Sequence, residues 1–350
     1  MIDFRYHLVS IVAVFLALAI GIVLGSTELQ GPTYNLLNQT TAKLQNELNQ
    51  ASSQRDAAQQ QADLGQNYAQ AVQPVVLHNL LAGQRLLIIT EPGAPASVVT
   101  AISNAATQDA GATVTGQIAL QSKFFDNSDT TLDGLNQINL AMSAADNIVL
   151  NTGTTYQQQA AQVIASEILT LAGAPQASVP PVTSTPAASQ QDTNAQTMLG
   201  AYANAGFLTI SGQPSDPATL AVIVTPQTAP SGGSADPLDQ LLVPVAEELA
   251  AKSSATVVAG VSADSGPGSP IAVLRASTAA SKVSTVDDTD FVAGQTVVIQ
   301  ALATQLNGGN PGSYGFANGA SAVAPSPAPT PSASASPTAT ASPASKKPKK

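Results

Sequence analysis

An uncharged apolar run near the N-terminus constrains this chain more than any other feature. Leu8 to Thr27 holds twenty residues without a formal charge. At about 1.5 Å rise per residue, a helix of that length crosses the roughly 30 Å hydrocarbon core of a bilayer. The sequence therefore predicts a transmembrane anchor within residues 1–27. A cleaved signal peptide is the alternative interpretation, because export signals also combine a short polar head, an apolar stretch and small residues such as Gly25-Ser26.

The charges that flank the run predict the orientation of the anchor. Arg5 precedes the apolar run and Glu28 follows it. Cytoplasmic flanks of membrane helices carry an excess of basic residues, so this bias places the N-terminus in the cytoplasm. We therefore expect a single-pass protein of the cell membrane whose bulk, from Glu28 onward, is extracytoplasmic.

Small residues recur every fourth position along the anchor. Such a ladder lets two helix backbones approach closely, although Ala and Gly are common in membrane helices for other reasons. The predicted anchor-packing residues are Ala13, Ala17, Gly21 and Gly25.

A Gln- and Ala-rich segment, Tyr34 to Val72, follows the anchor and repeats apolar residues at heptad spacing. The pattern predicts a parallel, self-associating coiled coil over residues 33–73. The seam thins in its second half, where Arg55 and Gly65 occupy core positions. A solvated single helix or an antiparallel hairpin is the alternative, and Gly31-Pro32 predicts a kink between two helices. The predicted seam residues are Tyr34, Leu37, Leu44, Leu48, Ala51, Ala58 and Ala62.

Residues 84–316 alternate short apolar runs with amphipathic segments. Strand, helix, strand in this rhythm predicts a doubly wound α/β domain with a mainly parallel sheet. Two lobes are the second interpretation, because four prolines mark residues 175–190 as an exposed linker. We expect strands at 84–90, 111–119, 146–151, 220–225 and 255–261. We expect helices at 95–109, 155–172, 236–251 and 292–306, and another around Met198 to Phe207; residues 271–274 continue the alternation.

The C-terminal segment, residues 317–350, consists mainly of Pro, Ala, Ser and Thr and ends in four lysines within its last five residues. Such a composition cannot bury a core, and it predicts a disordered tail with a basic end.

Composition excludes several classes of function. The net charge of −10 disfavours nucleic-acid binding, which needs a basic surface. The chain has no cysteine, two histidines (His7 and His78) and three methionines without a cluster. Thiolate, zinc and soft-metal sites are therefore not expected. Two acidic groups remain as possible ligands of hard cations, but we interpret them as solvated or helix-capping carboxylates; they are Asp126, Asp129 and Asp133, and Asp287, Asp288 and Asp290.

Signatures of cofactor binding and catalysis are also missing from the sequence. The loop after the first predicted strand, residues 91–95, has one glycine and two prolines, so it is neither G-x-G-x-x-G nor a P-loop. Residues 260–264 (GVSAD) superficially resemble a nucleophile elbow, but Asp264 replaces the second glycine. We therefore predict a protein that is not an enzyme and has no cofactor, no metal site and no catalytic residue.

Four segments carry a resemblance to a known family. They are the opening MIDFRYHLVSIVAVFLALAIGIVLGS, GAYANAGFLTISG at 200–212, STVDD at 284–288 and GSYG at 312–315. Together they resemble the actinobacterial copper transporter family, the MctB-like proteins. The resemblance implies an envelope protein with one anchor and a coiled coil, linked to copper efflux. A related member, SteB, implies instead a role in cell separation, in which the coil engages a peptidoglycan hydrolase beside a membrane partner.

Two hypotheses therefore stand beside each other. The family resemblance implies a role in copper transport or homeostasis. The residues favour a non-catalytic coiled-coil scaffold that recruits an envelope protein. An enzyme has only the fold in its support.

Overall fold

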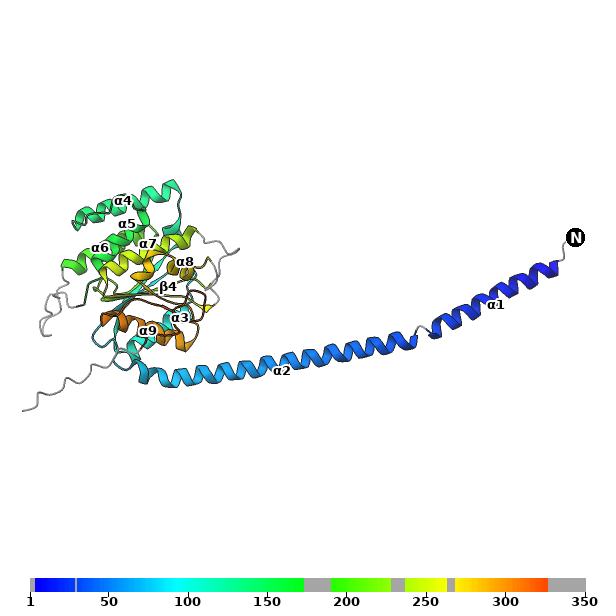
Figure 1. Cartoon of the computed structure of the whole chain (residues 1–350). Coiled ribbons are helices and arrows are strands. Elements are labelled where there is room, and N and C mark those ends of the chain that lie inside the picture. Colours follow the sequence, from blue (N-terminus) through cyan, green and yellow to red (C-terminus); the bar gives the residue numbers. More distant parts are fainter. Residues whose placement is uncertain (1–3, 29, 173–189, 228–236, 263–267, 327–350) are drawn as a thin grey trace, which may run out of the picture. The chain divides into compact units, whose positions relative to one another are not determined.

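A computed structural model describes residues 4–28, 30–172, 190–227, 237–262 and 268–326 of the 350-residue chain. The chain divides into two units, residues 1–67 and residues 68–350 (Figure 1). The predicted linker at 175–190, apart from Gln190, and residues 327–350 of the predicted tail lie outside the described residues.

The first unit contains two long helices. Helix α1 spans Phe4–Glu28, and helix α2 begins at Gln30 and runs to Leu77. Two successive helices agree with the prediction, but Gly31 and Pro32, predicted to lie between them, belong to α2. Pro32 falls in the first turn of α2, where its missing N–H costs no intrahelical bond. Gln, Ala and Leu favour α2 by their helix propensity. The described structure is a single chain, so coiled-coil pairing remains a prediction.

The last turns of α2 belong to the second unit and attach to its domain. Gln73 Nε2 donates a hydrogen bond of 3.1 Å to Thr296 Oγ1. Leu77 and Leu81 are fully buried. Pro74 lies inside the helix without ending it.

A seven-stranded sheet forms the centre of the second unit, in the order β3-β2-β1-β4-β5-β6-β7. All neighbours pair in parallel except β2 and β3, so β3 is an antiparallel edge strand. This confirms the predicted α/β class with a mainly parallel sheet. The strands are β1 (Arg85–Thr90), β2 (Thr113–Leu120), β3 (Leu208–Gly212), β4 (Leu220–Val224), β5 (Ala255–Ala259), β6 (Ser284–Val286) and β7 (Ser313–Tyr314).

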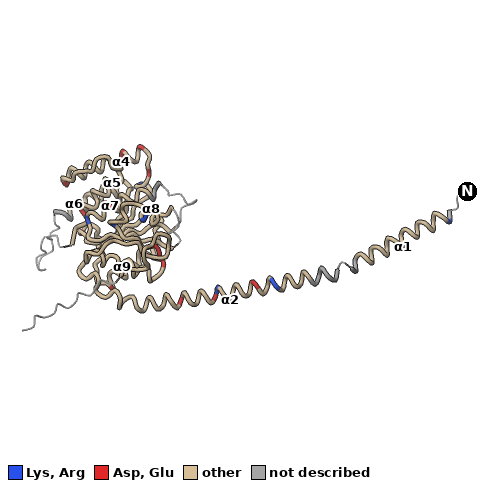
Figure 2. Tube along the Cα trace, viewed as in Figure 1, with Lys and Arg blue, Asp and Glu red and all other residues tan. Residues whose placement is uncertain are grey.

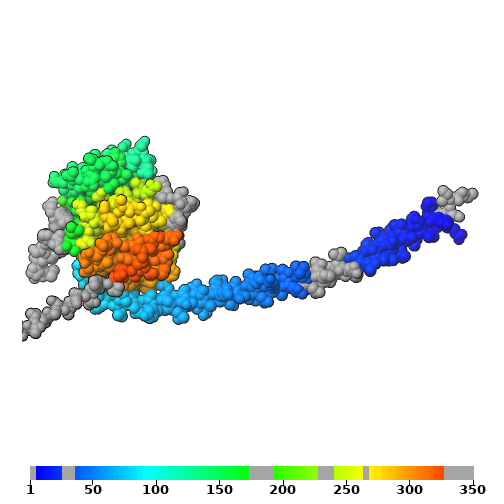
Figure 3. All heavy atoms as spheres, in the orientation of Figure 1, coloured from blue at the N-terminus to red at the C-terminus, as the bar shows by residue number. Residues whose placement is uncertain are grey.

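Helices cover both faces of the sheet and create two hydrophobic cores. Successive residues of β1 point to opposite faces: Leu87 and Ile89 join one core, while Leu86 and Ile88 join the other. Helices α5, α6, α7 and α8 lie over the first face, with α4 as an outer layer, and α3 and α9 cover the second face (Figure 1). In the space-filling view, the green, yellow and orange segments follow this layered order (Figure 3).

The helices of the second unit agree largely with the sequence pattern. Helix α9 occupies the predicted residues, and α5 and α7 begin within one residue of the predicted starts. The helices are α3 (Ala96–Asn104), α4 (Asp129–Ala145), α5 (Tyr156–Ile168), α6 (Gln190–Asn204), α7 (Pro237–Lys252), α8 (Pro270–Ala276) and α9 (Val292–Leu306). Short helical turns are η1 (Ala105–Asp109), η2 (Ser122–Phe125) and η4 (Thr278–Ser281).

One predicted strand is wrong. Residues 146–151 form a turn and an irregular segment that pairs with no strand. The side chain of Gln162 on α5 replaces the missing neighbour: Asn151 N–H donates to its Oε1 at 3.0 Å, and its Nε2 donates to Val149 O at 2.8 Å. Ile148 packs against the first core while Val149 is 85% exposed. An apolar run can therefore satisfy its backbone without a sheet.

The first ten residues of the predicted tail, 317–326, are among the described residues. Residues 317–326, expected in the disordered tail, fold against β7. Ala322 N–H bonds to Ser313 O at 3.3 Å, and Tyr314 and Ala322 form an isolated parallel bridge. These small residues and prolines lie along the edge of the sheet, and backbone hydrogen bonds hold them there instead of the burial of side chains.

Charged residues are sparse over the whole fold (Figure 2). In α2 they occur in the middle of the helix, where Lys43 Nζ lies 3.9 Å from Glu47 Oε1 and Arg55 Nη2 lies 2.7 Å from Asp56 Oδ1. Both pairs are exposed, so each contributes little to stability.

Candidate functional site

Helix α1 has the properties of a membrane helix. Its Arg5–Gly25 stretch is long and apolar enough to span a bilayer, and none of it is buried against other described residues. The predicted packing residues Ala13, Ala17, Gly21 and Gly25 are exposed. A methyl group added at Gly21 or Gly25 would meet no atom within 4 Å. This face is thus open in the single chain.

The seam residues of α2 are also uncovered. Leu37, Leu44 and Leu48 are 61%, 55% and 66% exposed, and Ala51, Ala58 and Ala62 are exposed as well. The side chain of Tyr34 lies outside the described part of the chain. Large apolar side chains in contact with water cost free energy, and a partner helix would remove that cost. The structure therefore presents the predicted seam without showing its partner.

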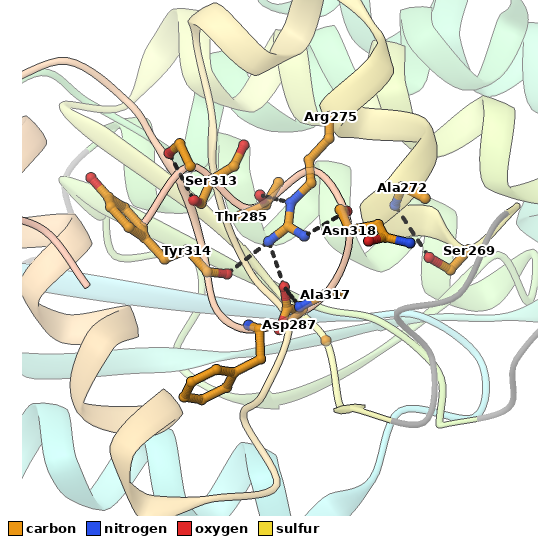
Figure 4. Close-up of polar contacts among 12 residues, drawn as sticks. Ser269, Ala272, Arg275, Thr285, Asp287, Ser313, Tyr314, Ala317 and Asn318 are labelled. Carbon is orange, nitrogen blue, oxygen red and sulfur yellow. Dashed lines mark hydrogen bonds and ion pairs between the residues drawn. The ribbon is translucent and has the colours of Figure 1, made fainter. Parts of the chain in front are cut away.

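A buried ion pair dominates the polar structure of the second unit (Figure 4). Arg275 Nη2 lies 2.8 Å from Asp287 Oδ2, and the side chains are only 5% and 2% exposed. Helix α8 presents the arginine: Ser269 caps the helix by accepting a hydrogen bond from Ala272 N–H, and Pro270 occupies its first turn. Asp287 directly follows strand β6. The pair thus joins the end of a helix to the carboxyl end of a strand.

The same ion pair holds the terminal strand in place. Arg275 donates to Thr285 Oγ1 at 2.9 Å, to Tyr314 O at 2.7 Å and to Asn318 O at 3.4 Å. Asp287 accepts the backbone N–H groups of Phe316 and Ala317. Charges buried with this many partners are well satisfied, so we call Arg275, Asp287 and their partners in residues 313–318 the terminal clamp.

Gly315 is required by the clamp. Its φ of +122° lies in a region that residues with a side chain rarely adopt, and an added Cβ would collide with the Asp287 carboxylate. Only glycine lets the backbone approach closely enough for Asp287 to accept the two following N–H groups.

Two further carboxylates follow Asp287 in the loop between β6 and α9. Asp288 is 2% exposed, and burial, together with the charges of Asp287 and Asp290, raises its pKa to about 6. Its Oδ1 has no hydrogen-bond partner among the described residues. Asp290 Oδ1 accepts from Ser262 N–H and Ser262 Oγ. Asp287 and Asp290 therefore bond to different partners, and among the described residues the three carboxylates do not form a group that could hold a metal ion.

The other candidate residues from the sequence are also placed individually. Asp126 accepts from Ser128 N–H, Ser128 Oγ and Thr131 Oγ1, and these hydrogen bonds lower its pKa. It orders the start of α4, as expected for a capping carboxylate. Ser262 of the elbow-like segment bonds to Asp290, whereas His78 contacts its neighbour Asn79. Within the described ranges, no three His, Cys, Asp or Glu side chains form a group that could hold a metal ion.

Arg275, which organises the clamp, was not among the residues predicted from the sequence. Its signal was weak but present: a single arginine stands in the apolar segment PIAVLRA, in a chain with only twelve basic residues. A basic residue in such a segment must reach water or a buried carboxylate. STVDD supplied the carboxylate, but the sequence did not show that the two would meet.

Comparison with known proteins decides the family. Residues 1–325 match the profile of a family described as "Copper transport outer membrane protein, MctB". The chain belongs to the MctB family. The protein called "Copper transporter MctB" in Mycobacterium tuberculosis (strain ATCC 25618 / H37Rv) is 31% identical over 332 residues, covering 92% of this chain and 99% of the relative. "Copper transporter MctB" of Mycobacterium bovis shows the same identity, and that of Mycobacterium leprae (strain TN) is 28% identical over 334 residues.

Two of the segments that resemble the MctB family are neighbours in the sheet. GSYG (312–315) forms β7 beside the β6 of STVDD (284–288), and together they supply Asp287, Tyr314 and Gly315 to the clamp. GAYANAGFLTISG (200–212) forms the end of α6 and the edge strand β3, where buried Tyr202 donates to Asn139 Oδ1 at 2.7 Å. The opening forms α1. In this MctB-family chain, the late motifs are thus parts of the domain's architecture.

Proposed function

We propose that this protein acts in copper handling at the cell envelope as a non-enzymatic, membrane-anchored component. The observation that carries the proposal is the family match, which covers the anchor, α2 and the α/β domain together. Three relatives that share 31% identity over nearly their whole length carry the name copper transporter. Membership over the full length, anchor included, supports a role in the same cellular setting.

The proposed role is indirect with respect to the metal. Cu(I) prefers Cys and Met ligands. The chain has no cysteine, Met198 is fully buried in the core, and Met142 packs against that core. We propose that the α/β domain does not hold copper tightly itself, and that the protein acts through an assembly. Calorimetry of the full-length protein tests this, because a stoichiometric Cu(I) site of micromolar affinity or better would overturn it.

The proposed topology follows from α1. We propose that α1 stays in the cell membrane with the N-terminus in the cytoplasm, and that α2 and the α/β domain are extracytoplasmic. The uncharged stretch and the position of Arg5 before it support this orientation. Cysteines introduced at residues 3 and 130 and labelled in intact cells with an impermeant maleimide test it: only the second should react.

We propose that two or more copies associate through α2. Three leucines of α2 at heptad spacing are more than half exposed. The small-residue face of α1, the helix before it, is also open. Both faces lie in the first unit, so one parallel arrangement can use both. We propose a second copy of this chain as the partner, because the heptad seam is self-complementary.

A cell-separation scaffold is the second candidate. The exposed seam of α2 favours it, since an apolar helix face also fits a coiled-coil segment of another envelope protein, such as a peptidoglycan hydrolase. Deletion separates the two candidates: loss of copper control supports the first, and chains of unseparated cells with unchanged copper support the second.

A further inference from the structure

The order of the strands reverses between β1 and β4. From β1 the chain passes through α3 to β2, and it later returns to β4 on the other side of β1. Helix α3 joins one core through Val98 and Ile102, whereas α7, which follows β4, joins the opposite core through Leu242 and Val245. The loops after β1 and β4 therefore separate at the carboxyl edge of the sheet. In open α/β sheets this is where ligands bind.

A cavity of about 140 Å³ lies at this position. Its walls come from the first turn of α3 (Ser97), from residues that follow β4 (Gln227) and β5 (Val261), and from the β6–α9 loop and the first turn of α9 (Asp290 and Gln295). The volume is several times the space that one water molecule needs, and it suits a ligand of a few heavy atoms. Four successive strand-end segments thus enclose a site that no family motif identified.

Asp290 is the charged residue among those that line the cavity. Asp290 Oδ1 accepts both bonds from Ser262, which fixes the carboxylate and leaves Oδ2 without a donor among the described residues. Gln295 Nε2 donates to Thr289 O at 3.1 Å, so its Oε1 is available as an acceptor. No Lys or Arg is among the lining residues. The negative charge of Asp290, with no cationic side chain in the lining, favours a cationic ligand that donates hydrogen bonds to it.

The surrounding loop also has surplus negative charge. Asp287, Asp288 and Asp290 lie within four residues, and Arg275 forms an ion pair with Asp287. Asp287 and Asp290 repel a negative charge on Asp288, which contributes to the raised pKa of that group. A positive charge held at Asp290 would offset this repulsion.

We propose that the cavity binds a small molecule carrying a primary ammonium group, which donates to Asp290 Oδ2 and to the amide oxygens of Gln295 and Gln227. An ammonium group has three donors and no acceptor, which matches three acceptor groups. The one-glycine loop at 91–95 lacks the backbone cradle of a nucleotide site. This site is independent of the copper role proposed above.

Calorimetric titration of the full-length protein in detergent tests the proposal. Ethanolamine is the probe, and ethylene glycol, in which a hydroxyl replaces the ammonium group, is its matched control. We expect saturable one-to-one binding of ethanolamine in the millimolar range, as suits a four-atom ligand, and at least tenfold weaker binding of ethylene glycol and of acetate. Asp290→Asn should weaken ethanolamine binding at least tenfold, while Asp133→Asn, an exposed carboxylate of α4, should leave it unchanged.

A second variant, Gln227→Ala, keeps the test decisive if Asp290→Asn disturbs the loop that the hydrogen bonds between Asp290 and Ser262 hold in place. The exposed side chain of Gln227 makes no hydrogen bond to a described residue, so Gln227→Ala should preserve the fold and weaken binding about threefold. The proposal is overturned if ethanolamine and ethylene glycol bind alike, or if folded Asp290→Asn and Gln227→Ala proteins bind ethanolamine as the unaltered chain does.

Discussion

Arg275 and Asp287 form an ion pair with a 2.8 Å contact between Nη2 and Oδ2 in a site where neither side chain is more than 5% exposed. The pair connects α8 to β6 and, through the backbone of residues 314–318, to the last strand of the sheet. Asp287 belongs to the family segment STVDD, and Tyr314, whose carbonyl oxygen accepts from Arg275, belongs to the family segment GSYG. The terminal clamp is thus a buried polar network that links α8, the end of β6 and β7.

Breaking the clamp should destabilise the domain strongly. Asp287→Asn leaves the Arg275 guanidinium buried without its counter-charge, so we expect a loss of about 3–5 kcal/mol in the free energy of unfolding. Lys282→Ala is the control, because its ion pair with Glu247 is 55% exposed on the lysine side and should matter by less than about 1 kcal/mol. Urea unfolding of both variants measures this. Equal, small losses would show that the clamp does not stabilise the fold.

Asp288 should make stability depend on pH. Its pKa is about 6 in the folded protein and near 3.8 when unfolded, so the folded state binds the proton more tightly. The unfavourable charge is therefore present in full above pH 6, and stability rises as pH falls from about 6 to about 4. Asp288→Asn should raise stability at pH 7 by about 1–2 kcal/mol after solvent screening.

Comparing the stability of the two proteins at pH 7 and at pH 4 separates the effect of Asp288 from the effects of other groups. At pH 4, Asp288 is protonated in the folded state, so the advantage of Asp288→Asn should largely disappear. Thermal unfolding of both proteins from pH 4 to 7.5 provides the measurement. A difference between them that stays constant over this range would contradict the assignment.

Gly294 should not tolerate a side chain. A Cβ at this position in the first turn of α9 would collide with the Asp288 carbonyl group. We expect Gly294→Ala to cost about 2 kcal/mol or more. Gly134→Ala is the matched change in α4, where no atom lies within 4 Å, and it should stabilise by about 0.5–1 kcal/mol through helix propensity. Denaturant midpoints that move in the same direction for both variants would refute this account.

The α2 seam can be tested with two neighbouring leucines. Leu37 occupies a predicted core position, whereas Leu36 does not, and the two are 61% and 65% exposed in the single chain. In full-length protein, Leu37→Ala combined with Leu44→Ala should weaken self-association at least tenfold, while Leu36→Ala should leave it nearly unchanged. Cross-linking and light scattering report the oligomer. A monomeric unaltered chain, or equal effects of the two changes, would argue against the seam.

Periodicity predicted the elements that bury apolar residues. The runs RLLIIT and LAVIV became central strands, and the 3.6-residue pattern of 292–306 became α9, because burial on both sides of a parallel sheet leaves a clear apolar signature. Edge strands leave no such signature: β3 is mostly exposed and β7 has two residues. Strands β3 and β7 were therefore not predicted from the sequence, and neither was the layer formed by α4.

The candidate site was harder to predict than the fold. STVDD and GSYG were visible as segments, but their pairing depends on a strand order that local patterns do not contain. Gln162 shows the same limitation, since its side chain satisfies the backbone at Val149 and Asn151 where a strand was expected. Helix α2, in contrast, could be predicted because its residue pattern is a property of the sequence alone, while pairing along its heptad seam stays a prediction.

Cell-associated copper tests the central claim most directly. We would compare the unaltered strain, a strain lacking the protein and the same strain complemented with the full-length chain, each with and without copper challenge, and examine the same cells for chaining. The account predicts that copper rises on challenge in the deletion strain and returns to normal on complementation. Unchanged copper in the deletion strain, above all with cells that fail to separate, would contradict a role in copper handling.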